Sequence, residues 1–105
     1  MNQTHTTIEV YIIEAVKKRR KELGISPNKL ALEIGLVRDF VRKTEDYTRG
    51  YKYNSNHLNE LAKILDCSIS DFYPPKYVEE NCIEEYHEIR ERRRQEMEKQ
   101  RKQKK

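Results

Sequence analysis

The sequence predicts an all-α protein in which a globular part, residues 1–75, precedes a charged helical extension, residues 76–105. Two observations favour this fold class. Apolar residues recur every three or four positions in several segments, which is the spacing of one face of a helix. The 105 residues include only 3 Gly and 3 Pro, so we expect few long loops. The hydrophobic fraction of 35% is modest, and a small helical domain can be built on it.

The first helix is predicted to begin near Ile8, with Thr7 as its cap, and to end before Gly24. The polar residues 1–7 are expected to fray. The core-facing stripe of this helix consists of Ile12, Ile13, Val16, Arg20 and Leu23. Because a charged residue on a core-facing stripe needs a partner, Arg20 is expected to form an ion pair.

The next segment predicts two short helices joined by a tight turn. Ser26 supplies a hydroxyl cap and Pro27 a favourable first residue for the second helix, which stops at Gly35. The third helix is expected to run from about Arg38 to Glu45, with Val41 on its buried side. Two short helices in this arrangement are what a helix-turn-helix requires.

The globular part closes with two more predicted helices. A polar, tyrosine-bearing loop over residues 46–56 precedes the fourth helix. The buried stripe of that helix is Leu58, Leu61, Ala62 and Leu65. Ser68 followed three residues later by Asp71 resembles a capping box for a short fifth helix that ends at Phe72. Two prolines then close the domain.

The extension is dominated by Glu, Arg, Lys and Gln. We expect a helix from about Tyr77 to Gln95, followed by a basic tail that frays. A narrow apolar seam runs along it, made of Val78, Cys82, Tyr86 and Ile89. This seam could pack on the domain, bind another protein or pair with a second copy, and pairing is the interpretation that we favour.

Composition excludes several classes of function. The net charge of +4 suits a polyanionic partner, although many unrelated proteins share such a value. The 2 Cys and 3 His show no metal-ligand spacing, so neither a metal nor a cofactor is expected. No Ser or Cys has a His placed by a recognisable motif, which argues against an enzyme. No apolar run is long enough to cross a bilayer and no signal peptide is in view, so a soluble cytoplasmic protein is expected.

From Ile12 to Phe72 the sequence resembles the phage repressor/Cro-like (XRE) helix-turn-helix family. The matching residues are Leu23-Gly24-Ile25-Ser26, Leu30-Ala31, Gly35-Leu36, Val41, Glu45, Leu58, Leu61-Ala62, Leu65, Cys67-Ser68 and Phe72. The resemblance implies a compact five-helix, lambda-repressor-like domain that binds double-stranded operator DNA, usually as a homodimer, and regulates transcription. Two departures are Val37, where the family usually has a hydroxyl cap, and a longer loop between Glu45 and Leu58.

The resemblance also implies roles for particular residues. Arg38, Asp39 and Lys43 fall where the family reads bases; the two cations suit guanine O6 and N7, and Asp39 suits cytosine N4. Glu45 occupies the position of the family's acidic residue and is the expected partner of Arg20.

A second group of residues suits the phosphate backbone, which positions the protein without specifying sequence. These residues are Ser26 through its backbone amide, Asn28, Lys29, Arg42, Arg49 and Lys52. Tyr51 and Tyr53 are either further phosphate contacts or aromatic rings packed on a surface turn, and the sequence does not separate the two readings.

Two hypotheses follow. The first is a sequence-specific DNA-binding transcriptional regulator, dimeric, whose helix over about residues 38–45 enters the major groove. The alternative is an antitoxin-like protein-interaction module whose C-terminal helix binds a partner protein. The two are compatible, and the identity of a neighbouring gene would discriminate them.

Overall fold

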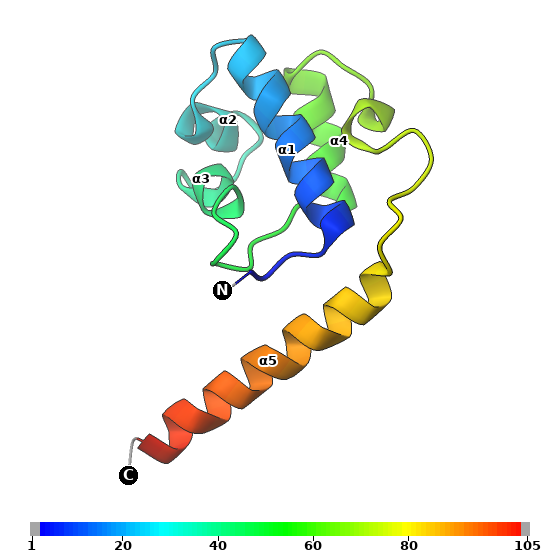
Figure 1. Ribbon diagram of the computed structural model, residues 1–105. Helices are drawn as coiled ribbons and strands as arrows, with labels where there is room; N and C mark the ends of the chain where they lie inside the picture. Colours follow the sequence, from blue (N-terminus) through cyan, green and yellow to red (C-terminus); the bar gives the residue numbers. More distant parts are fainter. Residues whose placement is uncertain (1–2, 104–105) are drawn as a thin grey trace.

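The computed structural model describes residues 3–103, and within that range every regular element is helical (Figure 1). The elements are α1 (Thr7–Glu22), α2 (Pro27–Glu33), α3 (Phe40–Thr44), α4 (Ser55–Ile64), the short 3-10 helix η1 (Ile69–Phe72) and α5 (Cys82–Gln103). The all-α expectation is therefore confirmed. The fifth short helix that the sequence predicted is the 3-10 turn η1, capped by Ser68 and Asp71.

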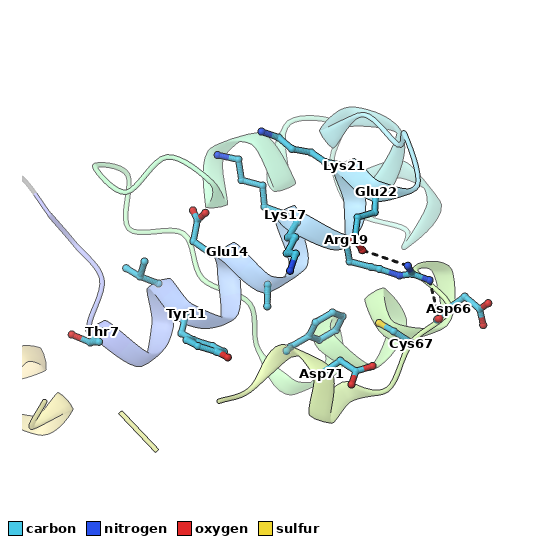
Figure 2. A pocket seen from close by; sticks show the side chains of 14 residues that line it. Thr7, Tyr11, Glu14, Lys17, Arg19, Lys21, Glu22, Asp66, Cys67 and Asp71 are labelled. Carbon is cyan, nitrogen blue, oxygen red and sulfur yellow. Dashed lines mark hydrogen bonds and ion pairs between the residues drawn. The ribbon is translucent and has the colours of Figure 1, made fainter. Parts of the chain in front are cut away.

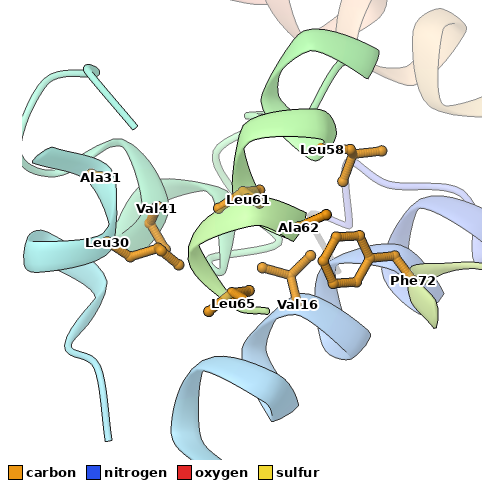
Figure 3. Close-up of a cluster of buried hydrophobic side chains, with 9 residues drawn as sticks. All are labelled: Val16, Leu30, Ala31, Val41, Leu58, Leu61, Ala62, Leu65 and Phe72. Atoms are coloured by element: carbon orange, nitrogen blue, oxygen red, sulfur yellow. The ribbon is translucent and has the colours of Figure 1, made fainter. Parts of the chain in front are cut away.

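α1 to α4 and η1 form one body around a shared core. Its buried apolar residues are Val16, Leu30, Ala31, Val41, Leu58, Leu61, Ala62, Leu65 and Phe72 (Figure 3). α2 and α3 each contribute one narrow apolar side, through Leu30, Ala31 and Val41, which have no exposed surface. The other sides of α2 and α3 contribute no residue to the buried apolar core.

The N-terminal segment is not frayed where the structure describes it, which corrects the expectation for residues 1–7. Thr4, His5 and Thr6 are buried. Thr6, rather than Thr7, caps α1, because its side chain and that of Glu9 form a reciprocal capping box. The N–H of Thr4 donates to the carbonyl of Tyr47 at 3.0 Å, and His5 Nε2 lies 2.7 Å from the carbonyl oxygen of Tyr51.

α5 differs from its prediction at both ends. It begins at Cys82 rather than Tyr77, because Asn81 Oδ1 accepts from the N–H groups of Ile83 and Glu84 and starts the helix there. It continues past Gln95 to Gln103, while the last two residues of the predicted tail lie outside the described range. Arg94 pairs with carboxylates one turn away on both sides, at 2.5 and 3.1 Å, which supports helix beyond Gln95.

The first half of α5 contacts the body, and the second half projects from it (Figure 1). Glu85 accepts hydrogen bonds from the N–H of Thr7 at 2.8 Å and from its hydroxyl at 2.6 Å. Arg92 donates to the carbonyl of Gln3. Cys82 and Ile89 of the predicted seam are half-buried, whereas Tyr86 is 40% exposed. No described helix is both long and apolar enough to cross a membrane.

Candidate nucleic-acid interface

The turn between α2 and α3 is set by local sequence signals at both ends of α2. Ser26 Oγ accepts from the N–H of Lys29 at 3.2 Å, and Pro27 is the first helical residue. At the other end Gly35 has a φ of +82°, a left-handed conformation that glycine adopts without strain. The N–H of Leu36 then donates to the carbonyl of Ala31 at 3.0 Å, which closes the helix end.

α3 is shorter than the sequence predicted. It covers Phe40–Thr44 instead of residues 38–45, and Arg38 and Asp39 form the turn that leads into it. Asp39 occupies the cap position but makes no capping hydrogen bond with its side chain. The absence of a hydroxyl at Val37 agrees with this late start, since a side-chain cap at that position would have extended the helix.

An ion pair fixes α3 to α1, as the interrupted stripe of the first helix predicted. Arg20 Nε donates to Glu45 Oε2 at 3.0 Å, and Arg20 Nη2 donates to Oε1 at 2.9 Å. The side chains are only 8% and 10% exposed. Arg20 Nη1 also donates to the carbonyl of Ile25 at 2.9 Å. One guanidinium thus holds both the end of α3 and the segment before α2.

The three residues expected to read bases lie together on the outer side of α3 and its preceding turn. Arg38 is exposed and has no ion-pair partner among the described residues. Asp39 lies 3.3 Å from Lys43 Nζ and 3.4 Å from Arg42 Nη2. The hydrogen bond from Lys43 lowers the pKa of Asp39 below its usual value, so the carboxylate is ionised at neutral pH.

The residues expected to contact phosphate divide into two groups. Ser26, Lys29 and Arg42 are exposed at the start of α2 and on α3. Asn28 is half-buried, and its Oδ1 is buried with no hydrogen-bond partner in the described part of the chain.

The loop cations do not all face α3. Arg49 is exposed and lies 3.2 Å from Asp46. Lys52 lies 3.1 Å from Glu9 and 5.8 Å from the ring of Tyr86, at the junction of α1 and α5. Lys52 therefore stabilises the attachment of α5, and its charge is already paired.

Tyr51 and Tyr53 of the loop form an aromatic cluster with Phe40 of α3. Phe40 lies 5.9 Å from the ring of Tyr51, 6.1 Å from that of Tyr53 and 4.9 Å from that of His57. The Tyr53 hydroxyl is buried with no hydrogen-bond partner in the part of the chain that the structure describes, so Tyr53 is a packing residue and not a phosphate contact. Tyr51 also packs, but its ring is 38% exposed and lies 5.5 Å from Lys43 Nζ.

One exposed residue was not assigned a role from sequence. Val37 is 69% exposed directly before Arg38, so its side chain lies beside the candidate base-reading group. The only sequence signal was its departure from the family's usual hydroxyl.

A separate groove runs along the outer face of α1 toward η1 (Figure 2). Arg19 closes one end by donating to the carbonyls of Leu65 at 2.8 Å and Asp66 at 3.2 Å. Cys67 lies in this groove, but burial and the nearby Asp71 carboxylate raise the pKa of its thiol. The raised pKa disfavours the thiolate form of Cys67, which is the nucleophilic form of a cysteine.

Comparison with known proteins gives a structural likeness only. No family model and no curated protein matches the sequence. The structure is similar to hydroxypropylphosphonic acid epoxidase from S. wedmorenis, with a TM-score of 0.59 and 24% identity over 72% of this chain. The same enzyme with an alternative substrate, (S)-1-HPP, gives a TM-score of 0.56 and 26% identity over 67% of this chain.

The chain matches 39% of the epoxidase in the first comparison and 35% in the second, so most of that enzyme has no counterpart here. Its structures include iron(II) and cobalt(II) forms. Within residues 3–103 of this chain, no group of three His, Cys, Asp or Glu side chains is placed to hold a metal ion. What the two proteins share is the helical fold.

Proposed function

We propose that this chain is a sequence-specific DNA-binding regulator of transcription, which inserts α3 and the turn before it into the major groove. The observation that carries the proposal is the outer side of α3. Arg42 and Lys43 lie on this short helix and Arg38 lies in the turn before it, and the end of the helix is held by a buried ion pair to α1. A rigid, basic, exposed helix following a tight turn is the geometry of a recognition helix.

The arrangement of charges supports separate roles for these residues. The guanidinium of Arg38 has no ion-pair partner among the described residues, so it suits bidentate contact with guanine. Lys43 and Arg42 share the Asp39 carboxylate, and either can exchange this partner for a base or a phosphate. The exposed Lys29, in the first turn of α2, suits the adjacent phosphate backbone, which positions the helix without reading sequence.

The proposal includes a homodimer, because operators of this class carry two half-sites about 34 Å apart. Sedimentation of the protein alone and with duplex DNA measures the stoichiometry. Two chains for each bound duplex are the expected result.

Catalysis is the less favoured function. The structural likeness to an epoxidase covers about two fifths of that enzyme, and the cysteine in the groove, Cys67, has a raised pKa that disfavours its thiolate. We therefore propose binding rather than chemistry as the activity of residues 3–103.

The test is selection of bound sequences from a random duplex library, followed by affinity measurements on the selected duplex. Lys43→Ala is expected to weaken binding to it by about tenfold or more, which is the loss of one good base contact. Lys63→Ala is a matched control, because Lys63 is also a helical lysine, 3.2 Å from a carboxylate of its own helix, but lies on α4. No enrichment of any sequence, or equal losses for the two variants, would contradict the proposal.

A further inference from the structure

Val37 is an exposed apolar residue in the turn that leads into α3. It is 69% exposed, and it belongs neither to the buried core nor to the apolar residues packed against that core. Leu36, Phe40 and Val41 are the other apolar residues of this segment, and none of them is exposed. A single exposed valine is ordinary on a protein surface. This valine is informative because of its position directly before the candidate base-reading residues.

The stability of the fold does not explain a valine at this position. A Ser, Thr, Asp or Asn side chain there could accept a hydrogen bond from the free N–H groups of the next turn. Valine has no acceptor, and α3 begins only at Phe40. Val37 therefore supplies neither a cap nor packing, and its methyl groups are available for contact with a ligand.

The backbone is fixed on both sides of Val37. The N–H of Leu36 donates to the carbonyl of Ala31 at 3.0 Å, and the N–H of Phe40 donates to the carbonyl of Val37 at 3.0 Å. The branched side chain of valine is also restricted in its rotation about χ1. Little conformational freedom is therefore lost when the methyl groups of Val37 contact a ligand, so even a small apolar contact contributes to affinity.

The charged groups beside Val37 favour a duplex over an apolar protein surface as this ligand. Arg38 is exposed and has no ion-pair partner among residues 3–103, and Asp39 lies 3.3 Å from Lys43 Nζ. An apolar partner surface that covered Val37 would also desolvate these charges, which is costly. In the major groove, by contrast, the apolar group that a base edge offers is the 5-methyl group of thymine, and hydrogen-bonding groups of the bases surround it.

We propose that Val37 contacts the 5-methyl group of a thymine in the operator and thereby selects thymine at one position. This inference rests on the proposed function, and it adds a base preference that the charged residues of α3 do not supply. Consecutive Cα atoms are about 3.8 Å apart, and consecutive base pairs are about 3.4 Å apart. The thymine should therefore lie within about two base pairs of the base that Arg38 reads.

Uracil lacks only the methyl group of thymine, so single thymine-to-uracil changes in the selected duplex test this contact. One such change is expected to weaken binding of the unaltered protein by about fourfold, as for the loss of one buried methyl group. Val37→Ala should bind the thymine duplex and that uracil duplex with almost equal affinity. Leu32→Ala is the matched control, because Leu32 is also an exposed apolar residue, at 59%, but lies on α2. This control should keep the discrimination of the unaltered protein.

Circular dichroism shows whether both variants retain their helices. The inference is overturned if no thymine-to-uracil change within about two base pairs of the Arg38 position weakens binding, or if Val37→Ala discriminates as well as the unaltered protein. Equal loss of discrimination in Leu32→Ala would also overturn it. In each of these cases a persisting effect of Lys43→Ala would leave the proposed function intact. If no sequence at all is enriched from the library, both proposals fail, so the two failures are distinguishable.

Discussion

Arg20 and Glu45 join α1 to the end of α3 through two parallel hydrogen bonds of 3.0 and 2.9 Å. Both side chains are almost fully buried, so neither charge can turn to water when its partner is lost. A buried ion pair contributes little net stability compared with apolar residues of similar size. Replacing only one of its two partners, however, strongly destabilises the folded protein, because the other charge is left buried and unpaired.

We therefore expect Arg20→Met and Glu45→Gln each to lower the free energy of unfolding by about 3 kcal/mol, measured by urea denaturation. The double change Arg20→Met/Glu45→Leu should recover most of this loss, because no charge is then stranded. Arg94→Met removes two exposed ion pairs and serves as the control, with stability nearly unchanged. Additive losses in the double variant would contradict the coupling.

Arg38 and Arg42 should differ in what they contribute to DNA binding. Arg38→Ala is expected to cost about 1–3 kcal/mol on the selected duplex and to relax preference at one base pair, because it removes a base contact. Arg42→Ala should weaken binding to all sequences and reduce the salt slope by about 0.9, as expected for one phosphate. Competition against single-base operator variants at several salt concentrations separates the two. The assignment fails if both variants lose affinity uniformly across sequences.

Tyr53→Phe should stabilise the protein. The Tyr53 hydroxyl is buried and has no hydrogen-bond partner among residues 3–103, and leaving such a group unsatisfied costs about 1 kcal/mol or more. Its removal is expected to raise the midpoint of thermal unfolding, while Tyr73→Phe, on an exposed ring, should leave it unchanged. A lower midpoint for Tyr53→Phe would show that the hydroxyl has a partner.

The same residue predicts a dependence on alkaline pH. Burial raises the pKa of Tyr53 above its ordinary value of 10.0. In the unfolded chain this hydroxyl loses its proton near pH 10, whereas in the folded protein it stays neutral to higher pH. The ionisation of Tyr53 therefore leaves the free energy of unfolding unchanged below pH 10 and lowers it above pH 10, where the unfolded chain loses the proton and the folded protein keeps it. Unfolding measured from pH 9 to pH 11 should show a smaller decline for Tyr53→Phe than for the unaltered protein.

Glu85 should control the attachment of α5. The hydrogen bonds from Thr7 lower the pKa of this carboxyl below its ordinary value of 4.5. The stabilising contribution is thus present above pH 4.5 and is lost as the pH falls through the lower folded value. Glu85→Gln is expected to increase amide hydrogen exchange in the first turns of α5 at neutral pH. Glu84→Gln, one residue along and exposed, is the control, and equal exchange in the two variants would contradict the role of Glu85.

Short-range signals predicted most of the helix ends in the body. Ser26, Pro27 and Gly35 each act on the chain within a few residues, so the limits of α2 followed from local chemistry alone. The ion pair between Arg20 and Glu45 was predictable because Arg20 lies on the apolar stripe of the first helix, where a charged side chain requires a partner of opposite charge.

Long-range contacts were not predictable in the same way. The N-terminal segment is held by the backbone carbonyls of Tyr47 and Tyr51, which are more than 40 positions away. Every residue has a backbone carbonyl, so the sequence does not indicate which of them will accept a hydrogen bond. Periodicity indicated α5 but could not show that Asn81 starts it. The packed ring of Tyr53 likewise depends on Phe40 and His57, which come from two other elements.

The Asp39 carboxylate has a consequence for how such a protein would search a genome. Because Asp39 already forms ion pairs with Lys43 and Arg42, the positive charge on the outer side of α3 is partly neutralised when no DNA is bound. At a random site the two cations would replace their ion pairs with Asp39 by ion pairs with phosphate, so the net gain in binding free energy would be small. At the correct site a base acceptor is gained as well. The internal carboxylate would thus shorten the time spent at wrong sites while leaving residence at the right one long.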